Sequence, residues 1–497
     1  MSGSIRLRYS GLVAFGSRIV SMLTGLIFII IVTRNLSVAD FGIWQYISII
    51  LGYAVFPSSF LPFWITRFYA RGYSIGKTGV VSNLIIASVA FLIFIFISIP
   101  ASNIIKTDIS YFYITGTQIF VMYLYASLRA LAQGRYPHLI GYAEMLFEIA
   151  KIIFAFLLFY VLRMGLVGAI IAVIFAYAVG CLFYLSRFIG EIGEDINWSL
   201  SKKWFSRIWV AAPDPFAGFL YSLDLLVLAL IIHQPEPLAL YRVAASVAVT
   251  THFAASLAIA LYPRLLSGGG IRDVEEILKL CLMFSIPMAV GTFVLAEPLL
   301  HLFKSDYETA TPLLKLMSVW APMVPLIVVM ENVIFGSVKV DLDVNVSFKK
   351  LMSSMLIVWP LTKYIRAFVA LPLIYLFVKI SLEYFPQQPY LYATIGCFLA
   401  NFIADILLFL LAYQISRKAL QFKFPIKNLT RYLGAATVMG LLVWIIHPAR
   451  SYETVLTVAV GSFVYFAVLS LIDSESRKLF KDVWAYLQSS RKETTIP

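Results

Sequence analysis

The sequence contains many uncharged, apolar runs that are long enough to cross a lipid bilayer. The first of them, Ile19–Val32, has no charged residue and, with its flanks, supplies the roughly 20 residues that a helix needs to span the hydrocarbon core. A bilayer offers no partners for free backbone N–H and C=O groups, so segments of this length must cross it as helices. The pattern therefore predicts an all-α, polytopic membrane protein.

Composition supports this interpretation. Of 497 residues, 61% are hydrophobic and 13% are charged, against about 25% charged in soluble domains. The first run is too long for a cleavable signal peptide and lacks a small-residue cleavage site. Cys181, Cys281 and Cys397 all lie in apolar runs, so they predict neither a disulfide framework nor a metal cluster. We expect no metal or other cofactor.

We predict about fourteen spans. They lie near residues 11–33, 41–65, 79–100, 111–133, 141–162, 164–186, 208–232, 239–263, 277–300, 312–336, 353–380, 390–415, 431–447 and 453–472. Six spans precede the long central link, so two six-helix bundles are expected as parallel pseudo-repeats. The predicted parts are an N-terminal bundle at 1–190, a cytoplasmic interfacial linker at 191–207, a C-terminal bundle at 208–415, an extra helix pair at 416–472 and a cytoplasmic amphipathic tail at 473–497.

The basic residues are distributed unevenly between the two sides. Of the 39 Lys and Arg, 27 lie at the N-terminus or in even-numbered links and five in odd-numbered links. The positive-inside rule then places both termini in the cytoplasm of a multi-pass protein of the cell membrane. The net charge of +13 therefore reflects topology. Anionic lipid headgroups are the expected partner of these charges, and nucleic acid is not.

Charged residues inside the spans are the most informative for function. A guanidinium such as that of Arg18 costs roughly 2.5–3.5 kcal/mol at membrane depth, so it is expected to face a wet cavity or a partner. Glu144, Glu148 and Lys151 have spacings of four and three residues and share one helix face. Either Glu148 and Lys151 neutralise each other, or Lys151 joins Arg18 in a cationic cavity.

The second half contains a similar choice. Asp224 and Arg242 lie in adjacent spans and could form a structural ion pair. Alternatively they have separate roles, with Arg242 facing the lumen. Glu331 and Asp405 are the other carboxylates within these later spans.

Three segments carry a resemblance to a known family. They are the exit of the first helix, TRNLSVADFGIWQY, with YSLDLLVLALII around Asp224 and LALYRVAAS around Arg242. These segments resemble the polysaccharide-transporter, O-antigen-type flippases for lipid-linked oligosaccharides, within the multidrug/oligosaccharidyl-lipid/polysaccharide superfamily. The hydropathy layout extends the resemblance over nearly the whole chain.

The resemblance implies a transporter. Its cargo would be an oligosaccharide on a polyprenyl or dolichyl (di)phosphate, moved from the cytoplasmic to the outer leaflet by alternating access for surface polysaccharide or glycoprotein assembly. Arg18, Lys151 and Arg242 would engage phosphate, with Arg67 at the inner mouth and Arg34 at the outer mouth. Glycan-assembly enzymes are further candidate partners.

Coupling to Na⁺ or H⁺ is a further implication of the resemblance. Asp224 and Asp405 would bind the coupling cation, and Glu144, Glu148 and Glu331 would support the site. The lipid II branch also uses a carboxylate in the eleventh helix, which this sequence lacks.

Two other function classes compete with the flippase. A cation-coupled multidrug antiporter of the same fold should favour carboxylates in its lumen, whereas seven basic and about five acidic residues lie inside these spans. A polysaccharide polymerase or glycosyltransferase should have a large outward loop with carboxylates. No outward link here exceeds about a dozen residues, so we expect no enzyme.

Overall fold

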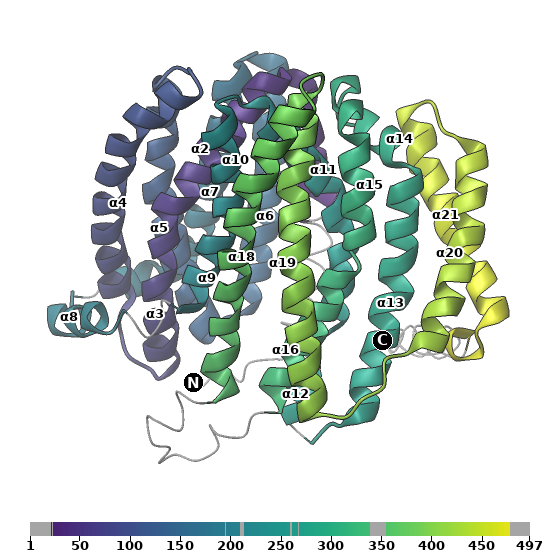
Figure 1. The fold of residues 1–497 in the computed structure, drawn as a ribbon. Coiled ribbons are helices and arrows are strands. Elements are labelled where there is room, and N and C mark those ends of the chain that lie inside the picture. The colour runs from purple at the N-terminus through teal and green to yellow at the C-terminus, as the bar shows by residue number, and fades with distance from the viewer. Residues whose placement is uncertain are drawn as a thin grey trace, which may run out of the picture. The chain divides into compact units, whose positions relative to one another are not determined.

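The computed structural model describes residues 21, 23–193, 195–208, 213–258, 261–266, 268–337 and 354–477. Within these ranges the regular elements are helices, and no strand occurs (Figure 1). Arg18 and residues 478–497 of the predicted tail lie outside the described part of the chain. The all-α, polytopic fold class is confirmed.

The chain forms two compact units, Met1–Val243 with Pro360–Asn401 and Ala244–Trp359 with Phe402–Pro497. The first unit contains an apolar helix at Leu23–Asn35, α2 (Val38–Val55), the 3₁₀ helix η1 (Phe56–Ser59), α3 (Phe60–Ala70), α4 (Gly76–Ile104), α5 (Ser110–Arg135), α6 (His138–Phe156), the π-helix η2 (Leu157–Val161), α7 (Gly165–Ile192), α8 (Trp198–Ser206), α9 (Pro213–Tyr221), α10 (Leu223–Ile232), most of α18 (Met355–Tyr384) and the beginning of α19 (Pro389–Ala419). The division falls within α11 (Glu236–Ala248), α18 and α19. The predicted domain boundaries stay a prediction.

The second unit holds the other helices. They are η4 (Val249–Ala258), α12 (Leu261–Leu266), α13 (Ile271–Val294), α14 (Ala296–His301), η5 (Ser305–Ala310), α15 (Thr311–Trp320), α16 (Met323–Gly336), the rest of α19, α20 (Ile426–Ile446) and α21 (Ser451–Ile472).

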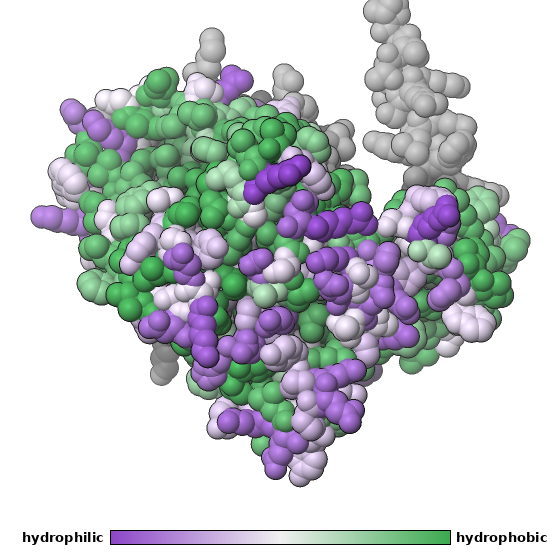
Figure 2. Space-filling view, turned by 90° about the horizontal axis from the view of Figure 1, so that it is seen from above, coloured by the Kyte–Doolittle hydropathy of each residue, from purple (hydrophilic) through white to green (hydrophobic). Residues whose placement is uncertain are grey.

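Eleven helical segments of the described chain are long and apolar enough to cross a membrane, so the protein is a multi-pass membrane protein. The exact count of fourteen is not confirmed. Three further predicted spans coincide with the helix Leu23–Asn35, with α5 and with α6. The last of these carries three charged residues, which lowers its apolar character. The face seen from above carries both hydrophilic and hydrophobic residues, and many of the hydrophilic ones gather toward its middle (Figure 2).

In the first unit, α5 packs against α3, α4 and α7. Buried polar side chains link these helices: Asn83 on α4 donates to Ser127 Oγ on α5 at 2.9 Å. Such bonds are worth forming in a bilayer, because the alternative is an unsatisfied polar group in hydrocarbon. The short helix α8 lies across the foot of α4 (Figure 1), and Ser201 Oγ bonds Ser82 Oγ at 2.7 Å. Trp204 is fully buried there.

In the second unit, α13 is central and packs against α15, α16 and α20. Helix α21 packs mainly on α20, and its Tyr465 hydroxyl donates to the Met283 carbonyl of α13 at 2.8 Å. The predicted extra helix pair is thus attached to α13 by apolar packing and by this hydrogen bond.

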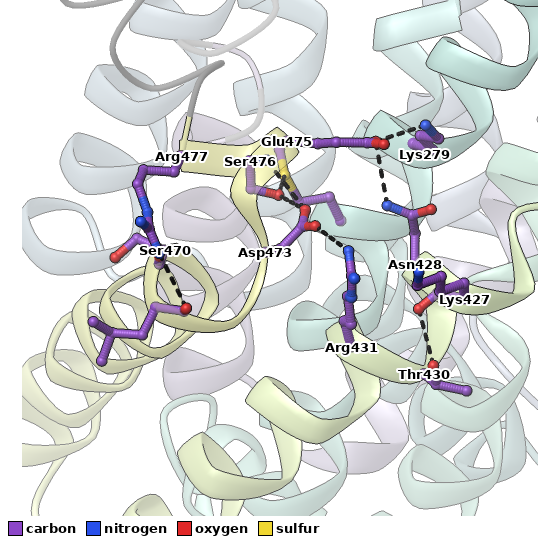
Figure 3. A network of polar contacts seen from close by, with 12 residues as sticks. Lys279, Lys427, Asn428, Thr430, Arg431, Ser470, Asp473, Glu475, Ser476 and Arg477 are labelled. Carbon is purple, nitrogen blue, oxygen red and sulfur yellow. Dashed lines mark hydrogen bonds and ion pairs between the residues drawn. The ribbon is translucent and has the colours of Figure 1, made fainter.

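A polar network fastens the end of this pair (Figure 3). Arg431 Nη1 on α20 lies 2.6 Å from Asp473 Oδ1, just beyond α21, and the Asp473 side chain is fully buried. Ser476 donates to the other carboxylate oxygen at 2.5 Å. Lys279 on α13 pairs with Glu475 at 2.6 Å. The network ties the end of α21 to both α20 and α13.

This network predicts a pH-dependent stability. Burial alone would raise the pKa of Asp473, but hydrogen bonds from Ser476 and the ion pair with Arg431 outweigh burial and lower that pKa. A lowered folded-state pKa stabilises the fold above the ordinary aspartate value of about 3.9, and this stabilisation is lost as the pH falls below it. Asp473→Asn should therefore cost about 1.5–3 kcal/mol at pH 7.

The measurement is the thermal unfolding of both proteins in detergent between pH 7 and pH 3. The difference in Tm between wild type and Asp473→Asn should be clear at pH 7 and become smaller as the pH falls below about 3.9. A difference of equal size at both ends of the range would contradict the assignment.

Candidate functional site

Lys151 lies in a compact cluster within the first unit. Its Nζ is 2.8 Å from Glu148 Oε2, and both side chains are 12% exposed. The same Nζ lies 5.1 Å from the ring centroids of Phe28 and Phe147. Glu148 also accepts a hydrogen bond from Thr24 on the first helix at 2.9 Å. The cluster joins the helix Leu23–Asn35 to α6.

These contacts explain how a lysine is tolerated at membrane depth. The carboxylate balances its charge, and the two ring faces attract the cation. The Glu148–Lys151 ion pair, one of the two predicted alternatives, is present. A direct contact between Lys151 and phosphate stays a prediction.

Glu144 is one turn earlier on α6 and pairs with Arg129 Nη2 at 2.8 Å. Arg129 lies on α5 (Ser110–Arg135), near the end of the predicted span 111–133, although it was counted with the basic residues of the following link. Both carboxylates of α6 thus have a cationic partner.

A second network joins α10, α18 and α19 in the same unit. Asn401 on α19 is 4% exposed, and its Nδ2 donates to Asp224 Oδ2 at 3.1 Å. Its Oδ1 accepts from Arg366 Nη2 on α18, also at 3.1 Å. The Arg366 guanidinium carbon lies 4.4 Å from the ring centroid of Tyr221. The amide of Asn401 therefore bridges a cation and a carboxylate.

The sequence interpretation did not select Arg366 or Asn401 as site residues. Arg366 had a signal, because it is a guanidinium inside the predicted span 353–380. The structure shows α18 as a continuous helix from Met355 to Tyr384. Asn401 had no signal beyond being an amide on a long apolar helix.

The remaining predicted carboxylates lie in the second unit. Glu331 on α16 accepts a hydrogen bond from the Trp359 indole at 3.1 Å. Asp405 is half-buried and follows Asn401 by four residues on α19. Asp224 belongs to the first unit, so the two predicted cation ligands fall in different units. Their role in coupling stays a prediction.

Three predicted cations have exposed side chains. Arg34 ends the first helix, and Arg67 lies on α3 with its guanidinium carbon 4.2 Å from the Phe63 ring centroid. Arg242 is about two turns inside α11, where the neighbouring Val243 and Ala244 are buried.

The described residues support neither a metal site nor a disulfide bond. No group of three or more His, Cys, Asp or Glu is placed to hold a metal ion. The three cysteines are buried and unpaired thiols. The chemistry available here is ion pairing and hydrogen bonding by guanidinium, ammonium, amide and carboxylate groups.

Comparisons with known proteins agree with this architecture. No family model and no curated protein sequence matches the chain. Among solved structures, the inward closed conformation of the lipid II flippase MurJ superposes with a TM-score of 0.65 at 15% identity, over 95% of this chain and 99% of that one. An inward-facing multidrug resistance MATE transporter gives a TM-score of 0.52 at 14% identity, over 80% and 95% of the two chains.

A MATE structure in the straight conformation gives a TM-score of 0.53 at 16% identity, over 83% of this chain and 96% of that chain. At these identities the likeness concerns the fold. This chain shares the fold of the lipid II flippase MurJ and of MATE transporters, and this is the fold that the resemblance in its sequence predicted.

Proposed function

We propose that this protein is a flippase that moves polyprenyl- or dolichyl-(di)phosphate-linked oligosaccharide from the cytoplasmic to the outer leaflet by alternating access. The proposal goes beyond the fold, which flippases and multidrug transporters share. It rests on how charge is distributed among the predicted site residues.

The observation that carries the proposal is that three of the predicted phosphate ligands are arginines with exposed side chains. Within the spans of the first unit, Glu144, Glu148 and Asp224 are held by Arg129, by Lys151 and by Asn401 respectively. The side chains of Arg34, Arg67 and Arg242 are exposed and therefore accessible to a phosphate group. Accessible arginines, together with carboxylates that already have polar partners, suit an anionic cargo better than a cationic drug.

Physical chemistry supports the same cargo. Sugar hydroxyls cost about 4–8 kcal/mol each in pure hydrocarbon, so the headgroup needs a wet path. The planar fork of arginine matches phosphate oxygens. Moving one negative charge outward across an inside-negative membrane gains roughly 2.3 kcal/mol per 100 mV.

The proposal includes three secondary expectations. Both termini face the cytoplasm of the cell membrane, glycan-assembly enzymes act before and after the transporter, and Asp224 or Asp405 couples transport to Na⁺ or H⁺. Arg18 stays a predicted phosphate ligand.

The test is a transport assay in proteoliposomes with a fluorescent polyprenyl-diphosphate-linked oligosaccharide. Arg242→Gln removes a charge-assisted interaction worth about 1.5–3 kcal/mol and should slow transport by about 10- to 100-fold. Arg242→Lys keeps the positive charge but loses the planar fork of the guanidinium. Its transport rate should lie between those of the wild type and Arg242→Gln. Arg187→Gln, which removes an exposed arginine near the end of α7, is the matched control and should transport normally.

The multidrug alternative is tested in the same vesicles. Ethidium efflux without movement of the lipid-linked sugar would overturn the proposal, and so would wild-type transport by Arg242→Gln.

A further inference from the structure

The short helix α8 packs against the first unit through one of its faces. Ser201 and Trp204, three residues apart, are 2% and 1% exposed and form this packed face. The hydroxyl of Ser201 bonds that of Ser82 on α4 at 2.7 Å. The ring centroids of Trp204 and Phe68 on α3 are 5.8 Å apart. Helix α8 is therefore held at the foot of α4 (Figure 1).

The contact with α4 lies just before the part of that helix that exposes apolar side chains. Helix α4 has 29 residues and is about 43 Å long, close to the roughly 40–45 Å of a bilayer with its headgroups. Its exposed apolar face begins at Ile85 and continues through Val89, Leu92 and Phe96. Ser82 precedes Ile85 by three residues, about one helical turn. Helix α8 thus lies at the height of the headgroup region.

The free surface of α8 is divided into two stripes. Trp198, Lys202 and Phe205 are spaced by four and three residues and form an aromatic-basic stripe beside the packed face. Trp198 and Phe205 are 52% and 36% exposed, although large rings gain much free energy when they leave water. The polar stripe lies opposite the packed face and consists of Ser199, Lys203 and Ser206. Only one of the two free stripes therefore suits an apolar surrounding.

The charge of α8 favours an anionic partner. The helix carries two lysines, both exposed, and no carboxylate, and the exposed Arg207 follows it directly. The exposed carboxylate of Asp195 lies in the link before the helix. Lysines and arginines close to a membrane surface are attracted by anionic lipids.

We infer that α8 is an in-plane membrane helix whose aromatic-basic stripe binds anionic phospholipids of the leaflet around the foot of α4. The rings of Trp198 and Phe205 enter the boundary between headgroups and acyl chains, as in other interfacial helices. Lys202 lies between them, and its long side chain reaches a lipid phosphate while its methylene groups stay among apolar atoms. The polar stripe faces water. The inference concerns lipids of the bilayer, so it does not rest on the proposed function.

Spin labels on adjacent residues test the orientation of α8 in nanodiscs. The label on Phe205→Cys should collide with oxygen, which concentrates in hydrocarbon, and the label on Ser206→Cys with a water-soluble nickel chelate. The three native cysteines are buried, and unsubstituted protein gives their background. If Phe205→Cys does not fold, Trp198→Cys and Ser199→Cys form a second pair across the same two stripes. Water-like accessibility of both labels in a pair would overturn the inference and point to a protein partner for the rings.

Hydrogen exchange tests the choice of lipid. Adding phosphatidylglycerol to phosphatidylcholine nanodiscs should slow amide exchange in residues 198–206 about fivefold, as expected for one lysine at an anionic surface. Lys202→Gln should remove most of this slowing. Lys203→Gln is the matched control, because it removes the same charge from the polar stripe, and it should keep most of the slowing. Equal exchange of the wild type in both lipids, or equal losses in the two variants, would overturn the inference.

Discussion

Gly42→Ala should severely destabilise the first unit. A Cβ atom on Gly42 of α2 would lie 2.1 Å from the Pro235 carbonyl oxygen and 2.5 Å from its carbon. That carbonyl accepts the first hydrogen bonds of α11, from Leu238 and Ala239, and the proline ring fixes its own φ. Neither the Pro235 carbonyl nor the backbone of α2 can move at low energetic cost. The methyl group must therefore push α2 away from the link before α11.

The expected cost is about 3 kcal/mol or more, because overpacking against backbone exceeds the gain of roughly 1 kcal/mol in helix propensity from Gly to Ala. Gly52→Ala on the same helix is the matched control, since a Cβ there meets nothing within 4 Å. Thermal unfolding in detergent should show a large loss of Tm for Gly42→Ala and no loss for Gly52→Ala. Equal Tm values would show that this contact is not tight.

Arg366→Leu should be the most damaging change within the polar network. The substitution removes the guanidinium that bonds Asn401 and stacks on Tyr221, and it leaves Asp224 held only by neutral groups among its contacts described above. A buried polar group that loses its partner lowers the free energy of unfolding by about 1–3 kcal/mol. We therefore expect a decrease in Tm on the order of 5 °C. Transport should also fall, because the network joins α10, α18 and α19.

A double-variant cycle distinguishes a network from unrelated contacts. Asp224→Asn should lessen the damage caused by Arg366→Leu, because the carboxylate that lost its counter-charge is removed too. Lys379→Leu removes an exposed cation from the same helix and should change neither Tm nor transport. Additive losses in the double variant would refute the coupling between Arg366 and Asp224.

Some contacts of the site could be predicted from sequence. Glu148 and Lys151 are three residues apart, so any helix places them on one face, and their ion pair was a stated alternative. Gly42 was visible only as part of the motif that resembles the flippases. Its physical reason, the approach of Pro235, required the folded chain.

The network of Asp224, Asn401 and Arg366 could not be read from the sequence. Asp224 and Asn401 are 177 residues apart, and Arg366 and Asn401 are 35 apart on separate helices. Hydropathy shows that each residue lies in an apolar segment, but not which way its helix is rotated. This rotation depends on packing against all neighbouring helices. Rotating one of these helices by half a turn about its own axis would separate the three groups.

The sequence by itself determined the all-α, polytopic class, because hydrocarbon forces each long apolar run to satisfy its own backbone hydrogen bonds. It also determined which residues bring charge into the membrane. The tertiary structure decided which charges meet, since inside a bilayer helices associate through close packing and interhelical hydrogen bonds rather than through hydrophobic burial. Those contacts depend on the shapes of several helices at once, which no local sequence pattern encodes.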